Sequence, residues 1–129
     1  MKLWVIDDDS IYQMLTKRMV EKSHPDIQVV SFLNGKLAFD ALSDAMQSGS
    51  QDELPSVVFL DINMPVMNGW EFLDAMIQRG FHSQLSARIY IVSSSIDKSD
   101  FEKAKTYDNV SDYLVKPLSK SDFEKYLIA

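Results

Sequence analysis

Cysteine is missing from all 129 positions of the chain. Its absence excludes disulfide scaffolds, thiolate metal sites and cysteine nucleophiles, and it is compatible with a reducing compartment. The sequence also has no apolar run near the roughly 18 residues that a membrane-spanning helix needs. The N-terminal stretch MKLWVIDDD turns acidic too early for a signal peptide. We therefore expect a cytoplasmic protein without a membrane partner.

Basic residues are scarce relative to acidic ones. The chain has 13 lysines and arginines against 19 aspartates and glutamates, so its net charge at pH 7 is -6. A surface that binds nucleic acid by releasing counterions from phosphates needs the opposite sign of charge. We therefore expect no direct nucleic-acid binding.

Short apolar runs alternate with longer stretches of helical periodicity. The runs are rich in β-branched and aromatic residues and predict five strands, over residues 3–6, 27–30, 57–60, 89–92 and 113–115. Such runs are typical of parallel strands that helices cover on both faces. The chain shows no internal repeat, low-complexity tract or linker, and its length suits one domain. The simplest architecture is a single domain over residues 1–129, with one βαβαβαβαβα sheet.

Start signals support four of the five predicted helices. In a capping box, a side chain at the helix start accepts a backbone hydrogen bond, and a Glu or Gln three residues later returns one. The candidate boxes are Ser10-x-x-Gln13, Asn68-x-x-Glu71, Ser99-x-x-Glu102 and Ser121-x-x-Glu124. The polar segments 47–56 and 79–87 are predicted loops.

Carboxylates follow the first and third predicted strands, because WVI runs into Asp7, Asp8 and Asp9, and VVFL runs into Asp61. Functional sites of open parallel sheets lie beyond the carboxyl ends of the strands. If these two strands are neighbours, the carboxylates converge and raise each other's pKa unless a cation neutralises them. An all-oxygen set without His or Cys favours Mg²⁺. For Asp7, Asp8 and Asp9, the simpler alternative is that they cap the helix that follows.

A hydroxyl and an ammonium group follow the last two predicted strands, in Ser93-Ser94-Ser95 and Lys116-Pro117. Taken singly, these could be a polar loop and a solvated lysine. Together with the carboxylates they suggest phosphoryl chemistry, since an Asp beside Mg²⁺ can attack phosphorus while an ammonium neutralises the transferred oxygens. The product, an aspartyl phosphate, is hydrolysable and suits signalling.

The motifs WVIDDDS, VFLDINMPVMNGWEF, IYIVSSS and DYLVKPL resemble, in order and spacing, the receiver domain of two-component response regulators over residues 2–128. The resemblance implies a flavodoxin-like (CheY-like) α/β fold, a doubly wound five-stranded parallel sheet in order 2-1-3-4-5 with five helices. It implies a histidine kinase or a histidine phosphotransfer protein as phosphoryl donor and a conformational switch read by a protein partner that the sequence does not identify. It also implies a signalling domain and not an enzyme, with slow autodephosphorylation at most.

The resemblance also assigns roles to individual residues. Asp61 would be the phosphoacceptor. Asp8, Asp61 and the backbone carbonyl of Asn63 would bind Mg²⁺, and Asp7 would act through water. Ser93 and Lys116 would bind the phosphoryl group, Tyr113 would change rotamer on activation, Pro117 would be cis, and Gly69 would adopt a positive φ in the turn after the phosphorylation loop. Asp9 has no family role and is expected to start the first helix.

Other classes of function stay open at this point. An Asp-nucleophile phosphohydrolase of the haloacid dehalogenase type forms the same intermediate, but those enzymes carry a DxDx[TV] pattern where this chain has DDDS. A flavin or nucleotide binder needs a Gly- or Ser/Thr-rich loop there. A receiver used only for interaction would not need the complete set of site residues. The chain could also be an intermediate shuttle in a phosphorelay; Met1 and the short tail after Ile128 favour a stand-alone regulator over part of a longer chain.

Overall fold

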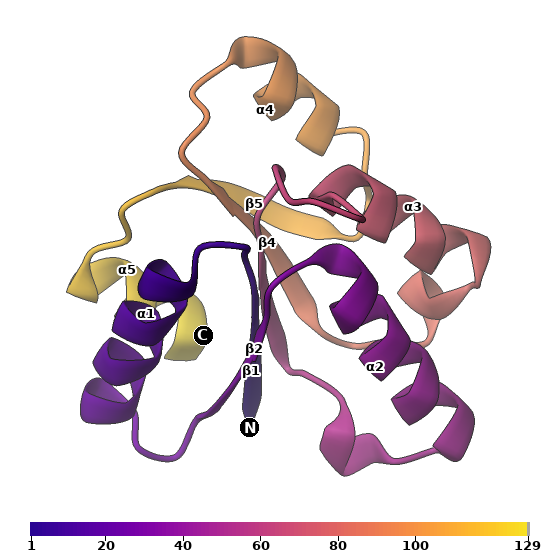
Figure 1. Ribbon diagram of the computed structural model, residues 1–129, viewed down its shortest axis with the longest axis horizontal. Helices are drawn as coiled ribbons and strands as arrows, with labels where there is room; N and C mark the ends of the chain where they lie inside the picture. The colour runs from indigo at the N-terminus through magenta and orange to yellow at the C-terminus, as the bar shows by residue number, and fades with distance from the viewer. Residues whose placement is uncertain (129) are drawn as a thin grey trace.

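The computed structural model describes residues 1–128 as a five-stranded parallel sheet between two helical layers (Figure 1). The strands are β1 (Lys2–Ile6), β2 (Gln28–Phe32), β3 (Val57–Leu60), β4 (Arg88–Ser93) and β5 (Val110–Val115). The helices are α1 (Ser10–Ser23), α2 (Gly35–Ser48), α3 (Gly69–Gln78), α4 (Lys98–Ala104) and α5 (Lys120–Ile128). The strand order β2-β1-β3-β4-β5 confirms the order that the resemblance implies. Within residues 1–128, no helix combines the length and apolar character needed to span a membrane.

The sheet separates two hydrophobic clusters. Successive side chains of a strand point to opposite faces, so Leu3 and Val5 of β1 join the cluster under α1 and α5, whereas Trp4 and Ile6 join the cluster under α2, α3 and α4. Figure 1 shows α1 and α5 together on one side of the sheet. All four residues of the central strand β3 are buried, which explains its continuous apolar run.

The two edge strands extend beyond the predicted ranges. The second strand covers Gln28–Phe32 where residues 27–30 were predicted, and the fifth covers Val110–Val115 where residues 113–115 were predicted. Both strands contain exposed residues, since each has only one neighbour in the sheet. Because both strands contain polar residues, apolar runs alone do not reveal their full length.

Helix starts agree with the sequence at α3 and differ at three other helices. At α3, Asn68 and Glu71 form the predicted capping box. At α1 the cap is Asp9, whose Oδ1 accepts hydrogen bonds from two backbone amides at 3.0 Å, so the candidate box at Ser10 is wrong and the helix-start role of Asp9 is confirmed. The boxes at Ser99 and Ser121 are also wrong, because both serines lie inside their helices.

The two polar segments predicted as loops each contain a short 3-10 turn. The first holds η1 (Gln51–Glu53) between α2 and β3, and the second holds η2 (Phe81–Ser83) between α3 and β4. Both turns lie at the end of the sheet where β3 and β4 begin. They are therefore remote from the carboxyl ends of the strands.

Candidate functional site

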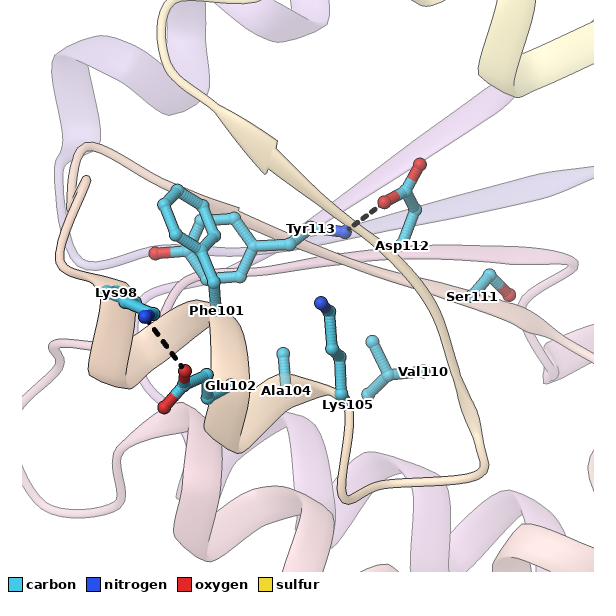
Figure 2. A pocket seen from close by; sticks show the side chains of 9 residues that line it. All are labelled: Lys98, Phe101, Glu102, Ala104, Lys105, Val110, Ser111, Asp112 and Tyr113. Atoms are coloured by element: carbon cyan, nitrogen blue, oxygen red, sulfur yellow. Dashed lines mark hydrogen bonds and ion pairs between the residues drawn. The ribbon is translucent and has the colours of Figure 1, made fainter.

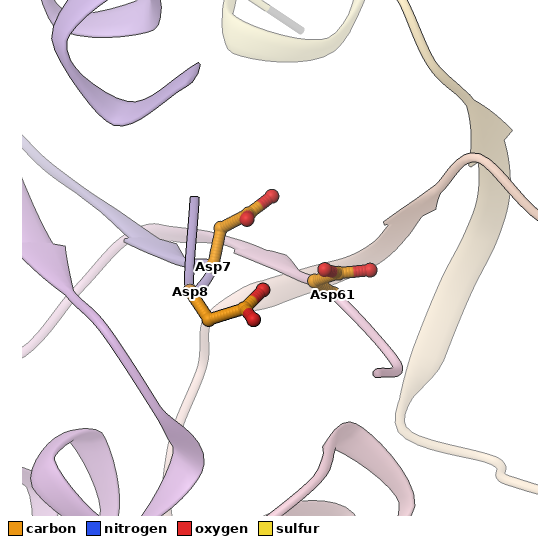
Figure 3. Close-up of side chains that lie close together, drawn as sticks. All are labelled: Asp7, Asp8 and Asp61. Carbon is orange, nitrogen blue, oxygen red and sulfur yellow. The ribbon is translucent and has the colours of Figure 1, made fainter. Parts of the chain in front are cut away.

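The carboxyl ends of β1 and β3 bring three carboxylates together (Figure 3). The two strands are parallel neighbours, with Ile6 opposite Leu60, so the residues that follow them share one edge of the sheet. Asp7, Asp8 and Asp61 each offer an oxygen to a group whose atoms all lie within 4.8 Å of one another. Asp7 and Asp61 are buried and Asp8 is exposed. The convergence predicted from the strand ends is confirmed.

Lys116 places an ammonium group among these carboxylates. It follows β5, and its Nζ donates a hydrogen bond to Asp7 Oδ2 and lies 3.6 Å from Asp61 Oδ2. The same nitrogen lies 4.3 Å from the centre of the Tyr12 ring on α1. The peptide bond between Lys116 and Pro117 is cis, as expected. The alternative of a solvated surface lysine is therefore wrong.

The electrostatic environment favours a bound cation. Burial raises the pKa of Asp61 to about 6; the charge of Lys116 opposes this, and the charges of Asp7 and Asp8 add to it. Burial alone would lower the pKa of Lys116, but its hydrogen bond to Asp7 and the nearby carboxylates outweigh burial and raise it. Three carboxylates against one ammonium leave excess negative charge. The donor set therefore fits a divalent, oxygen-binding ion such as Mg²⁺.

Ser93 is the last residue of β4, the neighbour of β3, and is almost completely buried. Its Oγ accepts a hydrogen bond from the backbone amide of Ser95 at 3.1 Å. Ser95 Oγ in turn donates to the carboxylate of Asp100 on α4 at 2.6 Å. The hydroxyl at the end of β4 is thus connected through Ser95 to α4.

Tyr113 lies on β5, away from the carboxylates, beside a surface pocket between α4 and β5 (Figure 2). Its half-buried ring packs edge-on against Phe101, with ring centres 4.4 Å apart and an angle of 69° between the ring planes. Its hydroxyl donates to the carbonyl of Ser95 at 3.0 Å. Ser95 therefore contacts both Ser93, to which the resemblance assigns phosphoryl binding, and Tyr113, to which it assigns a change of rotamer.

Residues 61–69 form the loop that carries Asp61 and the exposed Asn63. Two hydrogen bonds fasten it: Gly69 N–H donates to the Ile62 carbonyl at 2.9 Å, and Gly35 N–H of α2 donates to the Met67 carbonyl at 3.0 Å. One bond therefore joins the two ends of the loop, and the other joins the loop to the start of α2.

The expected positive φ of Gly69 is wrong. Among residues 1–128 the glycines with positive φ are Gly49 and Gly80, and within the loop it is Val66 that has a φ of 67°. Position 69 instead requires glycine because a Cβ there would lie 2.3 Å from the backbone oxygen of Asp61. The glycine therefore permits α3 to begin directly against the backbone of Asp61.

Gln13 and Tyr12 belong to the surroundings of the site, although neither was predicted to lie there. Gln13 was predicted to cap α1, but its side chain turns toward the sheet and donates to backbone carbonyls. The apolar pattern of the sequence does not reveal this orientation. The apolar residues Ile11, Met14 and Leu15 of α1 are exposed, whereas Gln13, Thr16 and Val20 form its buried face.

Comparisons with known proteins agree with the fold. The model of the family described as "Response regulator receiver domain" matches residues 3–128. The probable methanogenesis regulatory protein FilR2 of Methanothrix harundinacea is 30% identical over 122 residues, which cover 94% of this chain and 75% of FilR2. The nitrate/nitrite response regulator NarL of Escherichia coli is 31% identical over 124 residues, 95% of this chain, but the match spans only 51% of NarL.

Solved structures give the same picture. A two-component response regulator from Cytophaga hutchinsonii superimposes with a TM-score of 0.82 at 30% identity, covering 96% of this chain and 91% of the other. The chemotaxis protein CheY4 of Vibrio cholerae gives a TM-score of 0.75 at 21% identity, with coverage of 98% and 94%. The second match supports the fold alone.

Proposed function

The chain belongs to the response regulator receiver domain family, a family of signalling domains that are not themselves catalytic, and we propose that its Asp61 accepts a phosphoryl group in a Mg²⁺-dependent reaction. A receiver domain implies a cognate histidine kinase. The direct donor would be that kinase or a histidine phosphotransfer protein. The observation that carries the proposal is the cluster of Asp7, Asp8 and Asp61, with Lys116 reaching into it.

The transfer step is a displacement at phosphorus. A carboxylate oxygen of Asp61 attacks the phosphorus of a phosphohistidine, the P–N bond breaks, and the imidazole leaves with the electron pair and takes a proton from solvent. Lys116, 3.6 Å from Asp61, would balance charge on the transferred oxygens, and the Ser93 hydroxyl would donate a hydrogen bond to one of them. Bound Mg²⁺ would supply further charge neutralisation, held by Asp8, Asp61 and the Asn63 carbonyl, with Asp7 acting through water.

The proposed output is a conformational switch read by a protein partner. If the Ser93 hydroxyl turns toward a phosphoryl oxygen, its hydrogen bond with Ser95 must change. Ser95 bonds both Tyr113 and Asp100 of α4, so the change would extend to the surface of α4 and β5. A phosphorelay shuttle is the second candidate, in which the phosphoryl group passes onward to another histidine.

Labelling with acetyl phosphate and Mg²⁺ tests the phosphoacceptor. The wild-type protein should incorporate close to one phosphoryl group per chain, and Asp61→Asn should incorporate none. Asp40→Asn, which removes an exposed carboxylate from α2, is the matched control and should label normally. Labelling of Asp61→Asn at the wild-type level would overturn the assignment, and sustained turnover of acetyl phosphate would instead indicate a phosphohydrolase.

A further inference from the structure

Gln13 is a buried polar residue with an unusual set of contacts. Its side chain is on the sheet-facing side of α1 and only 5% exposed. The amide nitrogen Nε2 lies 2.7 Å from the carbonyl oxygen of Val5, 3.0 Å from that of Phe32 and 3.1 Å from that of Asp7. One amide group thus serves carbonyls at the ends of β1 and β2. The other end of the side chain, Oε1, has no hydrogen-bond partner within residues 1–128. The hydrogen bonds that hold the side chain in place are therefore those that its amide nitrogen donates.

These carbonyls lie where β1 leaves the sheet and the acidic residues begin. The register of β1 and β2 ends at Ile6 opposite Phe32, and one further bond joins Asp7 N–H to the Phe32 carbonyl at 3.0 Å. The carbonyl of Asp7 belongs to the peptide group that links Asp7 to Asp8. The Gln13 amide therefore fixes the orientation of that peptide group.

Asp8 depends on this peptide group more than Asp7 does. The Asp7 carboxylate is held directly, by Lys116 and by the amide of Asp9 at 2.9 Å. The Asp8 carboxylate has no hydrogen bond or ion pair to any of residues 1–128, and it is exposed. Its place beside Asp7 and Asp61 is consequently set by the backbone.

We propose that Gln13 is a positioning residue for the metal site. By holding the Asp7–Asp8 peptide group, its amide keeps the Asp8 carboxylate in the cluster and so raises the affinity for Mg²⁺. The inference rests on the proposed function, since it assigns a role toward the ion that the acidic cluster would bind. Groups that orient metal ligands typically change metal affinity by about 10–100-fold when they are removed.

The test compares Gln13→Met with the wild-type protein. Methionine has a similar length and no donor, so we expect Mg²⁺ to bind about tenfold more weakly. The dissociation constant is measured on folded protein by following amide chemical shifts during a Mg²⁺ titration. Thermal unfolding in EDTA gives metal-free stability separately. Val20→Ala, a cavity in the same buried face of α1, is the matched control and should lower stability with Mg²⁺ affinity unchanged within about twofold.

Each outcome decides the inference. If Gln13→Met unfolds at a lower temperature but binds Mg²⁺ as tightly as the wild type, Gln13 has only a structural role and the proposal is overturned. If the wild-type protein itself does not bind Mg²⁺, both the proposed function and this inference fall. If Gln13→Met does not fold, Gln13→Asn carries the same test, because its shorter side chain keeps an amide that cannot reach all three carbonyls.

Discussion

Asp61 is the residue at which the needs of folding and of chemistry conflict. It is 8% exposed and lies among two other carboxylates, so its charged form is disfavoured. The same carboxylate must be ionised to act as a nucleophile. The nearby ammonium of Lys116 relieves only part of the cost, and the pKa of Asp61 stays raised, at about 6.

Asp61→Asn should therefore stabilise the metal-free protein at neutral pH. The folded state holds the Asp61 proton more tightly than the unfolded state, whose pKa is near 3.8, so this group's effect on stability becomes less favourable as pH rises from about 4 to about 6. Above that range we expect a gain on the order of 1–2 kcal/mol in the variant, because each unit of pKa difference is worth about 1.4 kcal/mol and solvent screens part of it. Urea unfolding in EDTA at pH 4 and pH 8 measures the gain. An equal difference between the two proteins at both pH values would contradict the explanation.

Among individual residues, the sequence predicts the charged residues of the site but not the uncharged residues that position them. Asp7, Asp8, Asp61 and Lys116 are visible because each lies within two residues of the end of a strand. Gln13 is not, because its partners are backbone carbonyls, which any sequence provides. The sequence also does not show why position 69 requires glycine, because the requirement comes from the close approach of this residue to the backbone of Asp61.

The loop of residues 61–69 has a strained backbone at Val66. Val66 has a φ of 67°, and Met67 N–H donates to the Pro65 carbonyl at 2.7 Å, so the chain makes a γ-turn centred on a β-branched residue. Such a conformation is unfavourable for valine and easy for glycine. The Val66 side chain is 79% exposed, so little packing offsets the strain.

Val66→Gly should raise the free energy of unfolding by roughly 1 kcal/mol, since relief of backbone strain exceeds the added entropy of glycine in the unfolded chain. Val66→Ala is the control, because alanine keeps the Cβ that causes most of the strain. Chemical denaturation measures both variants. A less stable glycine variant would show that this turn is not strained.

Tyr113 connects the site with α4 through its hydroxyl and its ring. Tyr113→Ala should leave labelling of Asp61 within about twofold of wild type, because the ring does not contact the carboxylates. It should reduce the coupling between phosphorylation and partner binding, whose usual size is on the order of 1–3 kcal/mol. Amide shifts with and without beryllofluoride measure the response of residues 97–128.

Tyr113→Phe separates the two contacts of this residue. It keeps the ring against Phe101 and removes the bond to the Ser95 carbonyl. If residues 97–128 do not respond to beryllofluoride in the wild type while α1 does, the output surface is wrong and the phosphorelay shuttle becomes the better reading.

The elements differ in how well the sequence predicts them. The buried strands β1, β3 and β4 follow their apolar runs, whereas the edge strands β2 and β5 extend into polar residues. Helix caps were predicted correctly where Asn68 and Glu71 face each other and incorrectly at α1, where Asp9 precedes the serine and caps first. Local pattern predicts an element's existence, and tertiary contacts decide where it ends.

For the molecule as a whole, bound Mg²⁺ should act as a stabilising ligand. The folded state gathers three carboxylates that the unfolded chain keeps apart, so the ion binds the folded state better. At tenfold excess over the dissociation constant, the expected stabilisation is about 1.4 kcal/mol. Asp8→Ala should remove most of this effect and slow phosphorylation, while raising metal-free stability by removing a repelled charge.

Thermal unfolding with and without Mg²⁺ measures the effect of the ion. Asp44→Ala, which removes an exposed carboxylate from α2, should respond to Mg²⁺ as the wild type does. An undiminished response of Asp8→Ala would remove Asp8 from the metal site.

The division of the interior into two clusters has a consequence for how such a protein can evolve. The clusters share the backbone of the sheet, but none of the side chains that the structure describes belongs to both. Energetic effects of substitutions at separated sites such as Val20 and Met76 should therefore add, without the compensation that neighbouring residues require. A lineage can repack the interior beneath α1 and α5 while the interior beneath α2, α3 and α4 stays as it was. The two halves of the interior are in this way free to diverge at different rates.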